Sequence, residues 1–184
     1  MPTTEHARTA TAPRVANGAR KGPRLLPTRN DIPVDVRGKM VDLLNACLAD
    51  GLDLQMQLKQ AHWNVRGPDF IQLHELFDKL YGNVVRHNDT IAERIAALGG
   101  TAEGTVRVVA ERSRLADYPL TVQAGREHVA KVADAVAAFC GKVRGAIDQA
   151  DEAQDADTTD LFTSVSRALD QDLWFVEAHE TAQT

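Results

Sequence analysis

Residues 62–98 read HWNVRGPDFIQLHELFDKLYGNVVRHNDTIAERIAAL, and two pairs of metal-type side chains lie within this stretch. His74 and Asp78 are four residues apart, as are Asp89 and Glu93. A four-residue step along an α-helix turns by only about 40°, so each pair can point at a single metal ion. Imidazole mixed with carboxylate suits a hard or borderline cation such as Fe(II) better than a soft thiolate metal. The stretch therefore predicts a helix that carries two halves of a metal site.

A single helix cannot bring the two pairs to the same ion. Asp78 and Asp89 share a face, but they are separated by about 16 Å along the axis. Two metal ions in one catalytic site lie only about 4 Å apart. In an antiparallel two-fold dimer, the first pair of one subunit could meet the second pair of the other, because a two-fold axis repeats every contact. We therefore predict two equivalent intersubunit sites per dimer, each holding paired non-haem irons. The predicted ligands are His62, His74, Asp78, Asp89 and Glu93.

Apolar residues elsewhere in the chain repeat at the three-and-four spacing of bundle helices. Four long helices are predicted, with a long link between the second and the third, which indicates a bundle with a crossover connection. The first long helix is expected from Val34 to a stop at Gly67-Pro68, and the second from a capping box at Asp69 and Gln72 to Gly99-Gly100. The third is expected after Pro119 and Thr121, and the fourth after an acidic break at 151–157. A short extra helix is expected in the crossover, at 105–113.

The position of the ligand pairs on the second helix also favours an intersubunit site. Both pairs lie on the shoulder of the apolar stripe, which suits an interface between subunits better than the centre of one bundle. Di-iron sites in bundle cores use Glu-x-x-His motifs, and this sequence contains none. The alternative of a bundle-core di-iron oxidase is therefore weaker.

The residues around the ligand pairs resemble those of the Dps family, the DNA-binding ferritin-like proteins of starved bacteria. The resembling runs are Lys59-Gln60-Ala61-His62-Trp63-Asn64-Val65-Arg66-Gly67, Leu73-His74, Phe77-Asp78, Asp89-Thr90-Ile91-Ala92-Glu93-Arg94, Tyr118-Pro119-Leu120 and 170–177. About the last 150 residues are covered. The resemblance implies an all-α, ferritin-like four-helix bundle over residues 31–184. It also implies a hollow homo-dodecamer that oxidises Fe(II), preferably with hydrogen peroxide although dioxygen is also possible, and stores the ferric mineral. A bacterioferritin-like store is the runner-up.

The resemblance implies roles for several further side chains. Trp63, beside His62, would be an oxidisable ring that limits radical escape; the alternative is that it only packs. Asp89 is either a direct ligand or a support for the other ligands. The acidic residues around the start of the fourth helix would cap that helix or, as in the family, line a three-fold pore that attracts Fe(II). These acidic residues are Asp151, Asp155, Asp157 and Asp160.

The first thirty residues differ in composition from the rest of the chain. They carry six basic residues and one acidic residue, a net charge of +5. The whole chain has a net charge of −5, so the remaining residues together carry −10. With several prolines and glycines and few large apolar residues, this segment cannot bury enough surface to fold. We expect a disordered basic arm over residues 1–30 that binds DNA without sequence preference; the alternatives are a solvated tail or a transit peptide. Its basic residues are Arg8, Arg14, Arg20, Lys21, Arg24 and Arg29.

Length and composition set the remaining expectations. A chain of 184 residues fits one folded domain behind the arm and needs no disulfide. Cys47 and Cys140 show no zinc spacing and are expected to be core residues in a reducing cytoplasm. No run of eighteen apolar residues occurs, so no membrane partner is expected. A cytoplasmic, nucleoid-associated iron oxidase is the leading hypothesis, and a structural nucleoid protein with a secondary metal site is the competing one.

Overall fold

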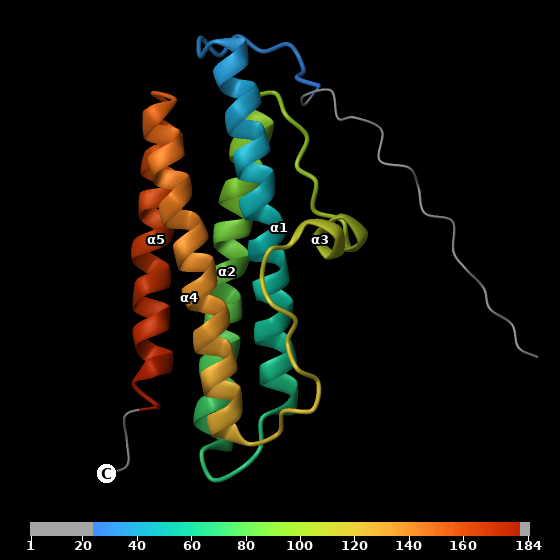
Figure 1. Ribbon diagram of the computed structural model, residues 1–184, viewed down its shortest axis with the longest axis vertical. Helices are drawn as coiled ribbons and strands as arrows, with labels where there is room; N and C mark the ends of the chain where they lie inside the picture. Colours follow the sequence, from blue (N-terminus) through green and yellow to red (C-terminus); the bar gives the residue numbers. More distant parts are fainter. Residues whose placement is uncertain (1–23, 181–184) are drawn as a thin grey trace, which may run out of the picture.

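The computed structural model describes residues 24–180, and within this range all regular structure is helical. The helices are α1 (Val34–Asn64), α2 (Phe70–Ala97), α3 (Val106–Arg112), α4 (Gly125–Glu152) and α5 (Ala156–Glu177). The four long helices lie side by side, and the short α3 lies beside α1 in the link between α2 and α4 (Figure 1). The predicted all-α fold, four long helices with a short extra helix in the crossover, is confirmed.

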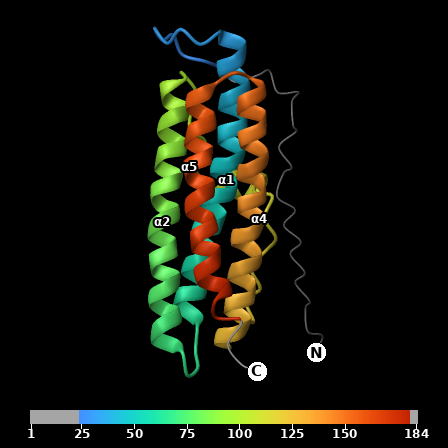
Figure 2. The same cartoon turned by 90° about the vertical axis from the view of Figure 1, so that its left-hand side faces the viewer.

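The chain passes along the bundle in two antiparallel helix pairs. α1 packs along α2 and α4 packs along α5, and the crossover returns the chain to the end of the bundle where α1 finished (Figures 1 and 2). There the loop after α1 is tied to the start of α4, because Arg66 N donates to Gln123 O and Gly125 N donates to Arg66 O. The ends of α1 and α2 that carry His62 and His74 are thereby fixed to α4.

Two sequence predictions at helix ends are wrong. Asp69 is the N-cap of α2, but its side chain makes no capping hydrogen bond. Its backbone has φ −95° and ψ 22°, whereas a side-chain cap requires the extended region. The acidic break is also narrower than predicted, because α4 continues to Glu152 and α5 begins at Ala156. The backbone of Gln154 reverses the chain between them with a φ of 60°.

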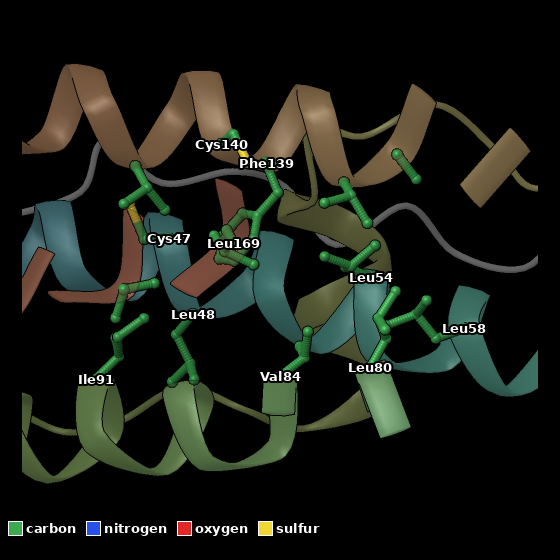
Figure 3. Packing of buried hydrophobic residues seen from close by; sticks show 14 of the residues in the cluster. Cys47, Leu48, Leu54, Leu58, Leu80, Val84, Ile91, Phe139, Cys140 and Leu169 are labelled. Carbon is green, nitrogen blue, oxygen red and sulfur yellow. The ribbon is translucent and has the colours of Figure 1, made fainter. Parts of the chain in front are cut away.

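The core lies between the four long helices and is almost entirely apolar (Figure 3). Phe77 of α2, Phe139 of α4 and Phe162 of α5 are fully buried within it. Cys47 and Cys140 are buried and free, as the sequence predicts for core residues. Burial raises the pKa of each thiol to about 11, so both remain protonated at neutral pH.

The crossover is fastened to α1 by buried polar groups. Asp50 is fully buried and accepts hydrogen bonds from the backbone and the guanidinium of Arg114. One turn earlier in α1, the side chain of Asn45 donates to Thr101 O and accepts from Glu103 N. These contacts hold the crossover, and α3 within it, against α1. Among residues 24–180, no helix has the length and apolarity needed to cross a membrane.

A glycine of α1, Gly51, allows side chains of α2 and α4 to lie close to the α1 backbone. A Cβ at Gly51 would lie 2.1 Å from Asn88 Oδ1 and 3.2 Å from Phe139 Cζ. Asn88 is buried and donates to Gln55, so its amide cannot move away without loss of that bond.

We expect Gly51→Ala to lower the free energy of unfolding by about 1–3 kcal/mol, because a methyl group must be forced into filled space. Gly141→Ala in α4 is the matched control, since a Cβ there meets nothing within 4 Å. The control should be neutral or stabilising by about 0.5–1 kcal/mol. Chemical denaturation of both variants measures the difference, and equal stability would contradict the close approach.

Candidate metal centre

Two histidines from different helices stack against each other near the end of the bundle. The ring centroids of His62 on α1 and His74 on α2 are 3.7 Å apart, with an interplanar angle of 22°. His62 Nδ1 lies 2.8 Å from His74 O, and His74 Nδ1 lies 2.9 Å from His62 O. A carbonyl oxygen only accepts, so both Nδ1 atoms must carry the proton. Each ring therefore keeps Nε2 as the nitrogen that can bind a metal.

The carboxylate of Asp78 lies one turn beyond His74 and pairs with a lysine. Lys59 on α1 forms an ion pair and hydrogen bond with Asp78 Oδ1. The hydrogen bond and charge of that ammonium hold the pKa of the Asp78 carboxyl below its usual range. The group therefore stays ionised and available to a cation. Two imidazole nitrogens and a carboxylate are a donor set that fits Fe(II).

The second pair of predicted ligands lies farther along α2, away from the histidines. Asp89 and Glu93 are both exposed and are one turn apart. Asp89 borders an open hollow between α1, α2 and the crossover, whose apolar lining includes Leu52 and Val85. Within residues 24–180, no three His, Cys, Asp or Glu side chains come together as a metal site requires. One subunit thus presents two incomplete sets of donors.

Large apolar side chains are exposed on both helices that carry the candidate ligands. On α1, Met56 is 52% exposed and Trp63 is 62% exposed, and seven residues separate them, so they share a helix face. On α2, Val85 is 36% exposed, between the two ligand pairs. An exposed apolar surface with a few charged groups is typical of a protein interface.

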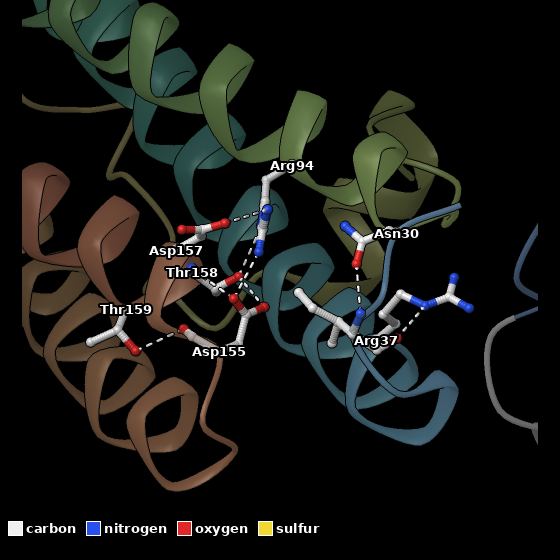
Figure 4. A network of polar contacts seen from close by, with 8 residues as sticks. Asn30, Arg37, Arg94, Asp155, Asp157, Thr158 and Thr159 are labelled. Carbon is white, nitrogen blue, oxygen red and sulfur yellow. Dashed lines mark hydrogen bonds and ion pairs between the residues drawn. The ribbon is translucent and has the colours of Figure 1, made fainter. Parts of the chain in front are cut away.

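The predicted acidic cluster divides into buried and exposed members. Figure 4 shows two of them, Asp155 and Asp157, with Arg94. Asp155 is 2% exposed, caps α5 by accepting from Thr158 N, and pairs with Arg94 at 2.7 Å. Its carboxylate is therefore engaged in holding α2 to the start of α5. Asp157 is exposed and lies 3.6 Å from the Arg94 guanidinium. Asp151 and Asp160 are also exposed, so three of the four keep the exposure that a pore lining requires.

Only the last part of the predicted basic arm falls within the described residues. Arg24 and Arg29 are exposed. Leu26 N donates to Gly99 O at 2.7 Å, so the chain lies against the end of α2 at this point. Gly99 has a φ of 83°, and a Cβ there would meet Leu26 O. Arg8, Arg14, Arg20 and Lys21 lie outside the described residues.

Sequence reasoning assigned no role to Lys59, although a signal was present. Lys59 precedes His62 by three residues, which places both on one face of α1. Its pairing with Asp78, nineteen residues later, depends on how α1 packs on α2. The buried His128 forms a hydrogen bond with Tyr118, and the half-buried His87 has a pKa lowered by burial. Neither histidine belongs to the predicted ligand set.

Comparisons with known proteins identify relatives of this fold. Residues 41–182 match a family model described as a ferritin-like domain. The chain is 42% identical to a DNA protection during starvation protein of Agrobacterium fabrum over 152 residues, which cover 83% of this chain and 94% of the relative. DpsC from Streptomyces coelicolor has a TM-score of 0.84 and 30% identity, covering 91% of this chain and 98% of that chain. Dps from Microbacterium arborescens, solved in a high iron form, has a TM-score of 0.75 and 32% identity, covering 83% of this chain and 97% of that chain. The ferritin-like fold is confirmed.

Proposed function

Because the chain belongs to the Dps family of ferritin-like proteins, we propose that it oxidises Fe(II) at sites shared between two subunits and stores the ferric product inside a homo-oligomer, a dodecamer as the resemblance implies. Hydrogen peroxide is the proposed oxidant, with dioxygen as the slower alternative. One subunit contributes His62, His74 and Asp78 to each site, and its two-fold mate contributes Asp89 and Glu93.

The reciprocal backbone clamp of the two histidines is the observation that carries this proposal. A metal-binding histidine commonly donates its second ring N–H to a carbonyl or carboxylate, which fixes its tautomer and orients the ring. Here each Nδ1 is tied to the carbonyl of the other histidine residue, so both Nε2 atoms are left for a ligand. A metal-binding imidazole gains from this arrangement, because the ring is oriented before the ion arrives.

The need for a second subunit follows from the separation along α2. The Asp78 and Asp89 positions are three helical turns apart on α2. The exposed Val85 lies between the two ligand pairs on α2, and the exposed Trp63 follows His62 on α1. An antiparallel dimer through these two helices would bury those side chains and complete both sites in one step. Burial of apolar area would supply the association energy, and the polar groups would set the register.

The chemistry requires two electrons per peroxide. Two Fe(II) ions held in one site can each give one electron, so that the O–O bond breaks and two protons complete two water molecules. No hydroxyl radical is released when both electrons are delivered together. In this proposal the carboxylates of Asp78 and Glu93 balance the charge of the substrate ions and the histidines orient them. Trp63, exposed beside His62, would quench a stray oxidising equivalent.

DNA protection is the second part of the proposed function. The folded body carries a negative charge and repels DNA, so the arm is the proposed binding segment, acting at the nucleoid. Several arms on one oligomer would bind cooperatively through multivalency. We also propose that the exposed Asp151, Asp157 and Asp160 draw Fe(II) towards the interior of the shell.

Complementation between inactive variants tests the iron site. We expect His74→Ala and Glu93→Ala shells each to lose fast peroxide-driven Fe(II) oxidation and still assemble, because neither side chain is buried in the core. Co-refolding the two variants in equal amounts places both lesions in one site of each mixed dimer and leaves the other site intact. Stopped-flow absorbance should then recover about a quarter of the wild-type activity.

The matched control mixes His74→Ala with Asp78→Ala. These two residues belong to the same half of the site, so both sites of every mixed dimer stay damaged and no activity should return. Size-exclusion chromatography and mass spectrometry verify that the shells are mixed. Fast oxidation in either single variant, or failure of the first mixture to recover in verified mixed shells, would contradict the intersubunit assignment.

Neutralising the arm tests the DNA hypothesis without altering the folded body. We expect the four-residue variant Arg8→Gln, Arg14→Gln, Arg20→Gln and Lys21→Gln to lose DNA retardation at low salt and to oxidise iron at the normal rate. Binding by the unmodified protein should weaken steeply as salt rises, because phosphate contacts release counterions.

The control for the arm removes an equal charge from the body. The exposed residues Lys39, Arg107, Lys142 and Arg167 are each changed to Gln. Gel shifts across a salt series compare the two variants with the unmodified protein. Normal binding by the arm variant, or greater loss by the body variant, would show that the arm is a solvated tail.

A further inference from the structure

We propose that Lys59 is a built-in cation that occupies the Asp78 half of the metal site and is displaced by the incoming divalent ion towards the ring of Tyr81. The inference rests on the proposed function, because it takes Asp78 as a metal ligand. It adds a residue that sets how strongly the site binds cations.

The geometry places the ammonium between two alternative partners. Lys59 Nζ forms an ion pair with Asp78 Oδ1, and the same atom lies 4.6 Å from the centre of the Tyr81 ring. Asp78 and Tyr81 are three residues apart on α2, so the two partners are neighbours on one helix face. The ammonium can therefore leave the carboxylate and keep the aromatic contact.

The two side chains of the Lys59–Asp78 ion pair differ in burial. The Lys59 side chain is 20% exposed, whereas the Asp78 side chain is 51% exposed. Within one subunit the lysine side chain is thus the more buried partner and the carboxylate the more exposed one. His62 lies one turn from Lys59 on α1, so a metal held by both His62 and Asp78 would lie beside the ammonium.

A divalent ion and the lysine compete for one carboxylate. If the ammonium stayed in place, it would repel the ion at short range. Because lysine carries a compact charge on a flexible stem, it can move without disturbing the helix backbone. The face of the tyrosine ring offers an attractive position for it after displacement. The lysine thus keeps the empty carboxylate paired and excludes cations that bind carboxylates more weakly than it does.

Equilibrium binding of Co(II) measures this competition without iron oxidation. Lys59→Met keeps the length of the apolar stem and removes the charge. We expect assembled Lys59→Met shells to bind Co(II) about five- to tenfold more tightly than the unmodified protein, with unchanged stoichiometry, in isothermal titration calorimetry. Lys59→Gln should change the affinity in the same direction and serves if the first variant fails to assemble.

Tyr81 variants provide the second arm of the experiment. Tyr81→Leu removes the ring that receives the displaced ammonium, so Co(II) affinity should fall about two- to fivefold. Tyr81→Phe retains the ring and should bind as the unmodified protein does. In a Lys59→Met background, Tyr81→Leu should lose its effect, because no ammonium remains to be received. A purely structural role of Tyr81 would give the same loss in both backgrounds.

Asp78→Ala separates failure of this inference from failure of the proposed function. Unchanged Co(II) binding in Asp78→Ala shells would overturn the metal site itself. Loss of binding in Asp78→Ala, together with equal or weaker binding in Lys59→Met, would leave the site intact and overturn the displacement of Lys59. The second result would mean that the lysine orients Asp78 for the metal instead of competing with it.

Discussion

The rigid repeat of α2 is the constraint on which the rest of the molecule depends. Its 28 residues carry both ligand pairs on one side, and the axial rise keeps those pairs too far apart to meet. A helix cannot bend back on itself within three turns. In the proposed function, the site can therefore close only if a second copy of α2 lies antiparallel to the first. Under that proposal, oligomerisation is part of the chemistry, because residues 24–180 of an isolated subunit present only two incomplete sets of candidate ligands.

The remaining contacts keep α2 in place for that purpose. At one end, the clamp between His62 and His74 joins α1 to α2. At the other end, Arg94, the neighbour of Glu93, is tied to the buried Asp155 at the start of α5. Between them, the apolar core and the close approach at Gly51 fix the spacing of the helices. The ligands are therefore held by a stiff frame and do not depend on flexible loops.

Local patterns in the sequence were sufficient for the fold and for the positions of the candidate ligands. Helical spacing predicted the long helices, and α3 lies within its predicted range, because apolar periodicity reflects burial directly. The capping box at Asp69 failed because the dihedral angles of a loop depend on neighbours that the local pattern does not contain. The capping of α5 by Asp155 was among the predicted roles and is confirmed. The pairing of Asp155 with Arg94 and that of Lys59 with Asp78 were out of reach, since both join residues from different helices. The arrangement of two subunits lies beyond a single chain for the same reason.

The most direct measurement is the position of the metal in crystals of the assembled protein soaked anaerobically with Fe(II), located by anomalous diffraction at the iron edge. Our account expects iron beside a two-fold axis, bound by His62, His74 and Asp78 of one subunit and by carboxylates of α2 from its mate. Iron enclosed among α1, α2, α4 and α5 of one subunit, or bound on α2 without a contribution from a second subunit, would contradict it.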